Sequence, residues 1–121
     1  MCDINHKKSE NLCGIYVHIP FCKAKCRYCD FTSYPGKIGY AEAYMACVYK
    51  EMKLRAGELA GRRFGSVYFG GGTPSAIDAK LIAGAVRQLR ELYDLAQDAE
   101  ITVELNPESV TAEKLAVYKS V

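Results

Sequence analysis

The fold of this 121-residue chain is decided by the stretch SVYFGGGTPS at residues 66–75. Residues 66–69 combine a β-branched residue with two aromatic residues, which is typical of a strand, and the glycines and proline after them predict a tight turn. From Ser75 onward apolar side chains recur at helical spacing, and Ser75 with Asp78 resembles a capping box at a helix start. These apolar positions are Ile77, Leu81, Ile82, Ala85, Val86, Leu89 and Tyr93. The stretch therefore predicts a strand, a turn and a helix in succession.

The same order of strand and helix recurs on both sides of this stretch. Upstream, residues 14–20 predict a strand and residues 38–60 a helix, whose apolar stripe includes Cys47, so we expect Cys47 in the core. Downstream, residues 101–105 predict a strand and residues 111–119 a helix. The predicted class is α/β with the order βαβαβα. This alternation implies a parallel sheet with right-handed crossovers, either doubly wound or part of a β/α barrel.

Each predicted strand alternates between aliphatic and polar side chains. The positions on the mainly aliphatic face are Ile15, Val17, Ile19, Val67, Phe69, Ile101, Val103 and Leu105. We expect this face to lie under the helices, and the opposite face to line a crevice or barrel lumen that holds a polar ligand. On that opposite face Tyr16 and His18 also fit ordinary packing roles. Glu104 needs a partner or a ligand, because an interior carboxylate is costly to leave unpaired.

The composition is that of a soluble globular domain, with 50% hydrophobic and 25% charged residues. A net charge of +2 is too small to argue for nucleic-acid or membrane binding. The first residues lack the apolar run of a signal peptide, and no stretch approaches the roughly 20 apolar residues of a membrane span. We therefore expect a cytoplasmic protein with reduced thiols, no nucleic-acid partner and no transmembrane segment.

Three of the six cysteines lie close together, as Cys22-x-x-x-Cys26-x-x-Cys29. In a reducing compartment, clustered cysteines are more often metal ligands than disulfides. Three thiolates on a short loop can bind three irons of a 4Fe-4S cluster and leave one iron without a protein ligand. A structural zinc site needs a fourth ligand, which Cys13 or Cys47 would have to supply. A non-catalytic zinc-binding domain therefore stays an alternative.

Three segments together resemble radical S-adenosylmethionine (radical SAM) proteins. They are residues 16–31 around the cysteines, residues 69–75 with the glycine turn, and the Glu-Leu-Asn-Pro-Glu segment at residues 104–108. More narrowly, they resemble the oxygen-independent coproporphyrinogen III oxidase family and its HemW haem-chaperone branch. Because the three segments occur in the family's order and span nearly the whole chain, the resemblance is far more specific than any one segment.

The resemblance implies a 4Fe-4S cluster on Cys22, Cys26 and Cys29, whose open iron chelates the amino and carboxylate groups of S-adenosylmethionine. A reductant protein would supply the electron that cleaves this cofactor into methionine and a 5′-deoxyadenosyl radical, so no acid–base or nucleophilic residue of the chain is required. The resemblance also implies further cofactor-binding residues: Tyr16, Tyr28, Gly71, Gly72, Thr73 and, at the ribose, Glu104.

One position favours the haem-chaperone branch. In the oxidases of the family that these segments resemble, a further cysteine follows two residues after the third ligand. This chain has Phe31 at that position. The favoured function is therefore haem binding and delivery to haem-accepting proteins, although the haem-binding motif expected of that branch is not seen in the sequence. The alternative is the oxidation of the porphyrin substrate coproporphyrinogen III to protoporphyrinogen IX.

The resemblance also implies how the chain is divided. Residues 1–13 are expected to be an N-terminal extension, and residues 14–121 the N-terminal half of a partial (β/α)6 TIM-like barrel. We therefore expect a truncated radical SAM core domain that carries most cluster and cofactor contacts. It would have neither the substrate site nor full activity, and its third strand would be an open edge.

Overall fold

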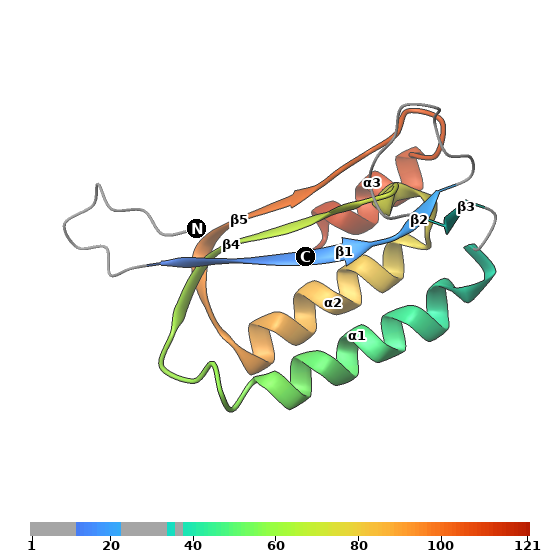
Figure 1. Ribbon diagram of the computed structural model, residues 1–121. Coiled ribbons are helices and arrows are strands. Elements are labelled where there is room, and N and C mark those ends of the chain that lie inside the picture. Colours follow the sequence, from blue (N-terminus) through green and yellow to red (C-terminus); the bar gives the residue numbers. More distant parts are fainter. Residues whose placement is uncertain (1–11, 23–33, 36–37) are drawn as a thin grey trace.

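The computed structural model of the protein describes residues 12–22, 34–35 and 38–121. Its main feature is a parallel three-stranded sheet in the order β1-β4-β5 (Figure 1). The three strands are β1 (Cys13–Ile19), β4 (Arg63–Gly71) and β5 (Asp94–Val103). Two short strands, β2 (Phe21–Cys22) and β3 (Tyr34–Pro35), form a separate parallel pair. The parallel pairing of successive strands confirms the predicted α/β class.

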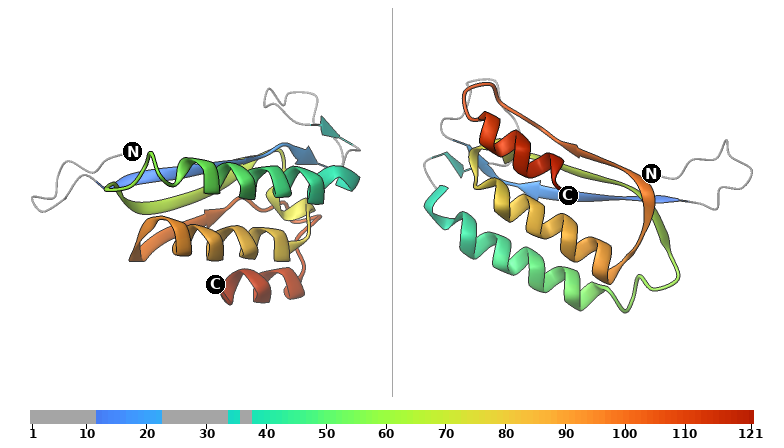
Figure 2. Two further views of the ribbon diagram at one scale, coloured as in Figure 1. Left: turned by 90° about the horizontal axis from the view of Figure 1, so that it is seen from below. Right: turned by 180° about the vertical axis from the view of Figure 1, so that it is seen from behind.

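Three α-helices cover one face of the sheet (Figures 1 and 2). They are α1 (Ala41–Arg55), α2 (Ala79–Leu92) and α3 (Ala112–Lys119), with the 3-10 turns η1 (Ile38–Tyr40) before α1 and η2 (Pro74–Ala76) before α2. Within the described ranges, no helix lies over the opposite face, where the side chains of Tyr16 and Tyr68 are 57% and 40% exposed. Helices on one face only are the arrangement of a segment of β/α barrel wall, and such barrels build their ligand sites at the carboxyl ends of the strands.

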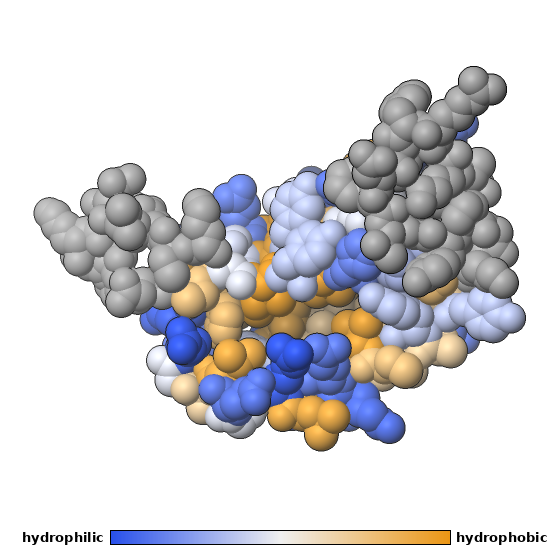
Figure 3. Space-filling model, in the orientation of Figure 1, coloured by the Kyte–Doolittle hydropathy of each residue, from blue (hydrophilic) through white to orange (hydrophobic). Residues whose placement is uncertain are grey.

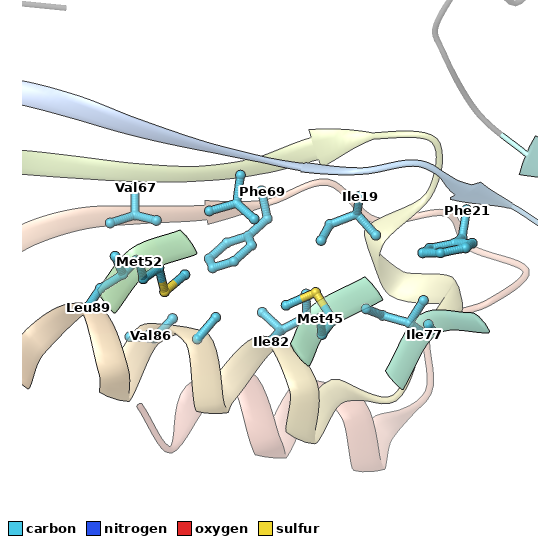
Figure 4. Packing of buried hydrophobic residues seen from close by; sticks show 13 residues of the cluster. Ile19, Phe21, Met45, Met52, Val67, Phe69, Ile77, Ile82, Val86 and Leu89 are labelled. Carbon is cyan, nitrogen blue, oxygen red and sulfur yellow. The ribbon is translucent and has the colours of Figure 1, made fainter. Parts of the chain in front are cut away.

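The hydrophobic core lies between the sheet and helices α1 and α2 (Figure 4). Its fully buried side chains include Ile19, Val67 and Phe69 from the strands and Met45, Ile82, Val86 and Leu89 from the helices. Full burial of one such side chain contributes about 1.5–3 kcal/mol to stability. The predicted aliphatic face is confirmed for β1 and β4. On β5, Ile101 and Val103 are only half-buried because this strand lies at the edge of the sheet, and Leu105 lies beyond the strand and is exposed.

The helix predicted over residues 38–60 is shorter, and Cys47 does not lie on its buried side. Only residues 41–55 form α1, and its buried side chains are Ala41, Met45 and Met52. Cys47 is exposed, so its expected place in the core is wrong. Apolar residues occur on more than one side of this helix, and the stripe through Cys47 competes with one through Met45. Packing against the sheet selects the methionine side, because long flexible side chains fill the space best.

The predicted capping box at Ser75 is also wrong. Ser75 lies in η2 and is fully buried, and α2 begins only after Asp78, whose Oδ1 accepts from the N–H of Lys80 at 2.9 Å. Pro74 starts the short 3-10 turn, and Ile77 then returns to an extended backbone with φ −96° and ψ 170°. The helix therefore needs a new N-cap, which Asp78 provides.

A hollow of about 430 Å³ opens between β1 and α1, where apolar side chains show on the surface (Figure 3). It reaches Tyr16 and His18 but none of the glycine turn or Glu104.

Among the described helices none is long and apolar enough to cross a membrane.

Candidate functional site

The carboxyl ends of β1, β4 and β5 lie at one edge of the sheet (Figure 1). Beyond β1 the chain runs through Phe21 to Cys22, beyond β4 it forms the rest of the glycine turn, and beyond β5 it reaches Glu104. The three segments that the sequence singled out therefore leave the sheet at the same edge. In β/α barrels this edge builds the binding site.

The glycine turn packs directly against the backbone that precedes the cysteine motif. The N–H of Gly72 donates to the carbonyl oxygen of Ile19 at 2.8 Å, and the N–H of Thr73 donates to that of Phe21 at 2.6 Å. A Cβ on Gly72 would lie 2.6 Å from this Phe21 oxygen. Gly71 has φ +116°, and a Cβ there would lie 2.8 Å from the Ile19 oxygen. Both glycines are required by this close approach of two backbones.

The carboxylate of Glu104 is held by two donors of β4. Its Oε2 accepts from the hydroxyl of Tyr68 at 2.7 Å, and its Oε1 accepts from the N–H of Gly71 at 3.2 Å. The N–H of Glu104 donates to the carbonyl oxygen of Phe69 at 3.1 Å, which extends the ladder beyond β5. The carboxylate thus has partners inside the chain. Because an ionised carboxylate offers about four acceptor positions, each oxygen can still accept from a ligand.

Aromatic side chains adjoin this carboxylate on the open face of the sheet. The rings of Tyr16 and Tyr68 stack with centroids 6.0 Å apart and planes 21° apart. The hydroxyl of Tyr16 lies 3.1 Å from Nδ1 of His18. Sequence reasoning did not select Tyr68 as a site residue, although its place on the polar face of the strand was an available signal. The structure therefore adds Tyr68 to the group formed by Tyr16 and Glu104.

Both tyrosines of this group remain protonated at neutral pH. The pKa of Tyr68 is raised above its ordinary value of 10.0, first by the hydrogen bond to the Glu104 carboxylate and then by desolvation and negative charge. The pKa of Tyr16 is raised by burial and, to a smaller extent, by the charge of Glu104. The phenol of Tyr68 is therefore a stable hydrogen-bond donor to Glu104.

An alkaline titration is expected to reveal the contact between Tyr68 and Glu104. Because folding raises the pKa of Tyr68, the stability it contributes is present below pH 10.0 and is lost as the pH rises through the folded-state pKa. The difference in phenolate absorbance between the wild type and Tyr68→Phe reports the titration of Tyr68. Followed as the pH is raised, this difference should reach its midpoint above pH 10.0. The same difference measured in a Glu104→Gln background should have a lower midpoint. Equal midpoints in the two backgrounds would contradict the contact.

A hollow of about 410 Å³ separates the glycine turn from the segment after β5. Its lining comprises Gly72, Thr73, Glu104, Leu105, Asn106 and Pro107. Three of the residues expected to bind S-adenosylmethionine thus border one hollow, and Gly71 is joined to it through its hydrogen bond to Glu104. The hollow has backbone of the turn on one side and an anionic side chain on the other.

Buried serines and a lysine fix the outer wall of this hollow. The hydroxyl of Ser75 accepts from the N–H of Asn106 at 2.9 Å and lies 2.6 Å from the hydroxyl of Ser109. The Nζ of Lys114, on α3, donates to the carbonyl oxygens of Ser75 at 2.6 Å and of Ser109 at 3.0 Å. These contacts tie η2, the segment after β5 and α3 together.

Lys114→Met is expected to lower the free energy of unfolding by about 1–3 kcal/mol, because it leaves two largely buried carbonyl oxygens without this donor. Lys119→Met is the matched control, since it removes an exposed lysine from the same helix and should change stability by about 0.5 kcal/mol or less. Urea unfolding followed by circular dichroism measures both variants. Equal urea midpoints for the two variants would show that the hydrogen bonds from Lys114 contribute nothing to stability.

Part of the predicted site lies outside the described residues. This applies to Cys26, Cys29 and Tyr28, while Cys22 is described only as part of β2. In the described ranges no group of three potential metal ligands is found. Since two of the three predicted ligands lie outside those ranges, this finding does not test the cluster.

The parallel β/α units define an α/β protein whose candidate ligand site lies at the carboxyl ends of its strands. A family model described as the Radical SAM superfamily matches residues 16–121. The chain belongs to the radical SAM superfamily, as its motifs indicated.

The chain is similar to proteins named heme chaperone HemW. It is 36% identical over 110 residues to HemW of Mycobacterium tuberculosis (strain CDC 1551 / Oshkosh), covering 88% of this chain and 28% of that protein. It is 34% identical over 108 residues to HemW of Escherichia coli (strain K12), with the same two shares.

A solved structure of coproporphyrinogen III oxidase (HemN) from Escherichia coli, a radical SAM enzyme, also matches. Its TM-score is 0.83 and its sequence identity 30%, over 90% of this chain and 25% of that chain. The predicted radical SAM fold is thereby confirmed. The chain spans about a quarter of the length of these relatives.

Proposed function

We propose that the protein binds a 4Fe-4S cluster through Cys22, Cys26 and Cys29 and S-adenosylmethionine at the adjoining sheet edge, and that it acts as a haem chaperone. The observation that carries the proposal is the hydrogen bond from Thr73 to Phe21, which holds the glycine turn against the chain entering the cysteine motif. When bound and reduced, the cluster supplies the electron that cleaves S-adenosylmethionine. The residues of the chain bind and orient the cofactor.

The glycine turn fits a ligand that donates hydrogen bonds. The N–H groups of Gly71, Gly72 and Thr73 all donate within the chain, so the backbone of the turn has carbonyl oxygens rather than N–H groups left for a ligand. An ammonium group carries three donors and no acceptor. We therefore assign the amino group of the methionyl moiety, rather than its carboxylate, to this turn.

Glu104 fits the ribose of the same cofactor. Each of its oxygens already accepts one hydrogen bond and retains further acceptor capacity. Two neighbouring hydroxyls of a ribose could donate one hydrogen bond to each oxygen. Tyr16 would contact the cofactor beside Glu104. Tyr28, which belongs to the cysteine segment, would also contact the cofactor.

The haem-chaperone role is supported by the similarity to proteins named HemW and by Phe31 in place of a further cysteine. Haem would be the cargo, and haem-accepting proteins and a reductant protein the partners. A reducing compartment such as the cytoplasm belongs to the proposal, because the cluster requires free thiolates. The second candidate, a porphyrin oxidase, is favoured by the structural match to coproporphyrinogen III oxidase.

Anaerobic reconstitution of the whole protein with iron and sulfide, followed by titration with haem and incubation with coproporphyrinogen III, tests the proposal. We expect about four irons per chain, cleavage of S-adenosylmethionine on reduction, and haem binding without porphyrin turnover. Formation of protoporphyrinogen IX would replace the chaperone by the oxidase. Tight zinc binding with no reconstituted cluster would contradict both and support a zinc-binding domain.

A further inference from the structure

Three side chains meet over Gly70 on the open face of the sheet. A Cβ on Gly70 would lie 2.8 Å from Cε1 of Tyr68, 3.1 Å from Oε1 of Glu104 and 3.1 Å from Cε1 of Tyr16. The missing side chain of Gly70 therefore creates the space in which two phenol rings and a carboxylate pack together. Because Gly70 and Tyr68 belong to β4, this arrangement is tied to a central strand and not to a loop.

The two hydrogen bonds to Glu104 fix the plane of its carboxylate. They come from Tyr68 to one oxygen and from the Gly71 backbone to the other, so neither oxygen can rotate without losing a donor. The backbone donor at 3.2 Å is the longer of the two, and the phenol at 2.7 Å has the length of a strong hydrogen bond to a charged group. Tyr68 therefore contributes more than Gly71 to the orientation of Glu104.

The ring of Tyr68 is itself held in place. It stacks on the ring of Tyr16 across the neighbouring strand β1, with nearly parallel planes. A ring braced in this way loses little additional freedom when its hydroxyl donates to Glu104. The hydrogen bond is thus part of the free protein and is available before any ligand arrives.

We propose that Tyr68 is a positioning residue for S-adenosylmethionine, holding the Glu104 carboxylate so that its remaining acceptor sites face the two ribose hydroxyls. This inference rests on the proposed function, in which Glu104 binds the ribose. A preset carboxylate avoids the cost of ordering a flexible side chain on binding. Tyr68 does not have to touch the cofactor, since its effect passes through Glu104.

The inference is tested by comparing two ligands on the reconstituted protein: S-adenosylmethionine and its analogue that lacks both ribose hydroxyls. Tyr68→Phe keeps the ring and its stacking but removes the donor. We expect it to weaken S-adenosylmethionine binding by about three- to tenfold, the cost of ordering one freed side chain on binding, and to leave the binding of the analogue unchanged. Iron content and the circular dichroism spectrum should match those of the wild type.

Tyr93→Phe is the matched control, because it removes a phenol that donates to the carbonyl oxygen of Met52 on the helix-covered face. It should change the affinity for neither ligand. Equal weakening of both ligands by Tyr68→Phe would overturn the inference by showing a packing role, and so would no weakening of either. Failure of the proposed function looks different, because the wild type would then not bind S-adenosylmethionine, or Glu104→Gln would bind it as tightly as the wild type.

Discussion

Cys22→Ala, Cys26→Ala and Cys29→Ala are each expected to abolish assembly of the 4Fe-4S cluster, whereas Cys47→Ala should leave it intact. Three thiolates are the fewest that can bind three irons of the cluster, so the loss of any one leaves a second iron without a protein ligand. Iron and sulfide contents after anaerobic reconstitution, together with the visible absorption of the cluster, measure the outcome. We expect near-complete loss in the three motif variants.

Cys47 is a better control than its sequence pattern suggested. It is exposed on α1 rather than buried, so its replacement by alanine should change stability by about 0.5 kcal/mol or less. A second control, Cys13→Ala, changes a half-buried thiol at the start of β1. Equal cluster loss in Cys47→Ala would overturn the ligand assignment, and a zinc content that falls with Cys13 or Cys47 would point to the four-ligand zinc site.

The inner faces of β1 and β4 could be predicted from the sequence because period-two alternation is a direct result of strand geometry. The third strand could be predicted only in part, since β5 begins at Asp94 and ends at Val103 rather than spanning residues 101–105. Val67 and Phe69 are buried, and Tyr68 between them faces the open side, as the alternation indicates. The place of Cys47 on α1 could not be predicted in this way. The apolar residues of this helix leave more than one stripe possible, and only packing against the sheet decides between Met45 and Cys47.

The candidate site could be predicted as a set of motifs but not as a set of contacts. That Glu104 needs a partner followed from its place on an interior face, whereas the choice of Tyr68 depends on how β4 and β5 are aligned. The burial of Ser75 likewise depends on Asn106, Ser109 and Lys114, which are distant in sequence. A local capping pattern could not predict this burial, because the fold brings together three hydrogen-bonding partners from distant parts of the sequence.

Gly72→Ala is expected to lower the free energy of unfolding by about 2–5 kcal/mol, the sum of overpacking and two weakened hydrogen bonds. Its Cβ would lie 2.6 Å from the oxygen, 3.0 Å from the carbon and 3.1 Å from the nitrogen of Phe21. All three are backbone atoms, which cannot rotate away as the end of a flexible side chain can. Relief would require the glycine turn to move off the strand, which breaks the bonds from Gly72 to Ile19 and from Thr73 to Phe21.

Gly57→Ala is the matched control, because a Cβ on Gly57 meets nothing within 4 Å. It should change the urea midpoint little, and equal midpoints for the two variants would show that the turn tolerates a side chain. A second readout separates loss of stability from loss of the site. Phe21 directly precedes Cys22, so a glycine turn displaced from Phe21 should also disturb cluster binding. At a low temperature at which circular dichroism shows Gly72→Ala to be folded, we therefore expect this variant to have a lower iron content after reconstitution. Gly57→Ala should keep the wild-type content, because its turn lies at the opposite end of the sheet from β2, which contains Cys22 (Figure 1).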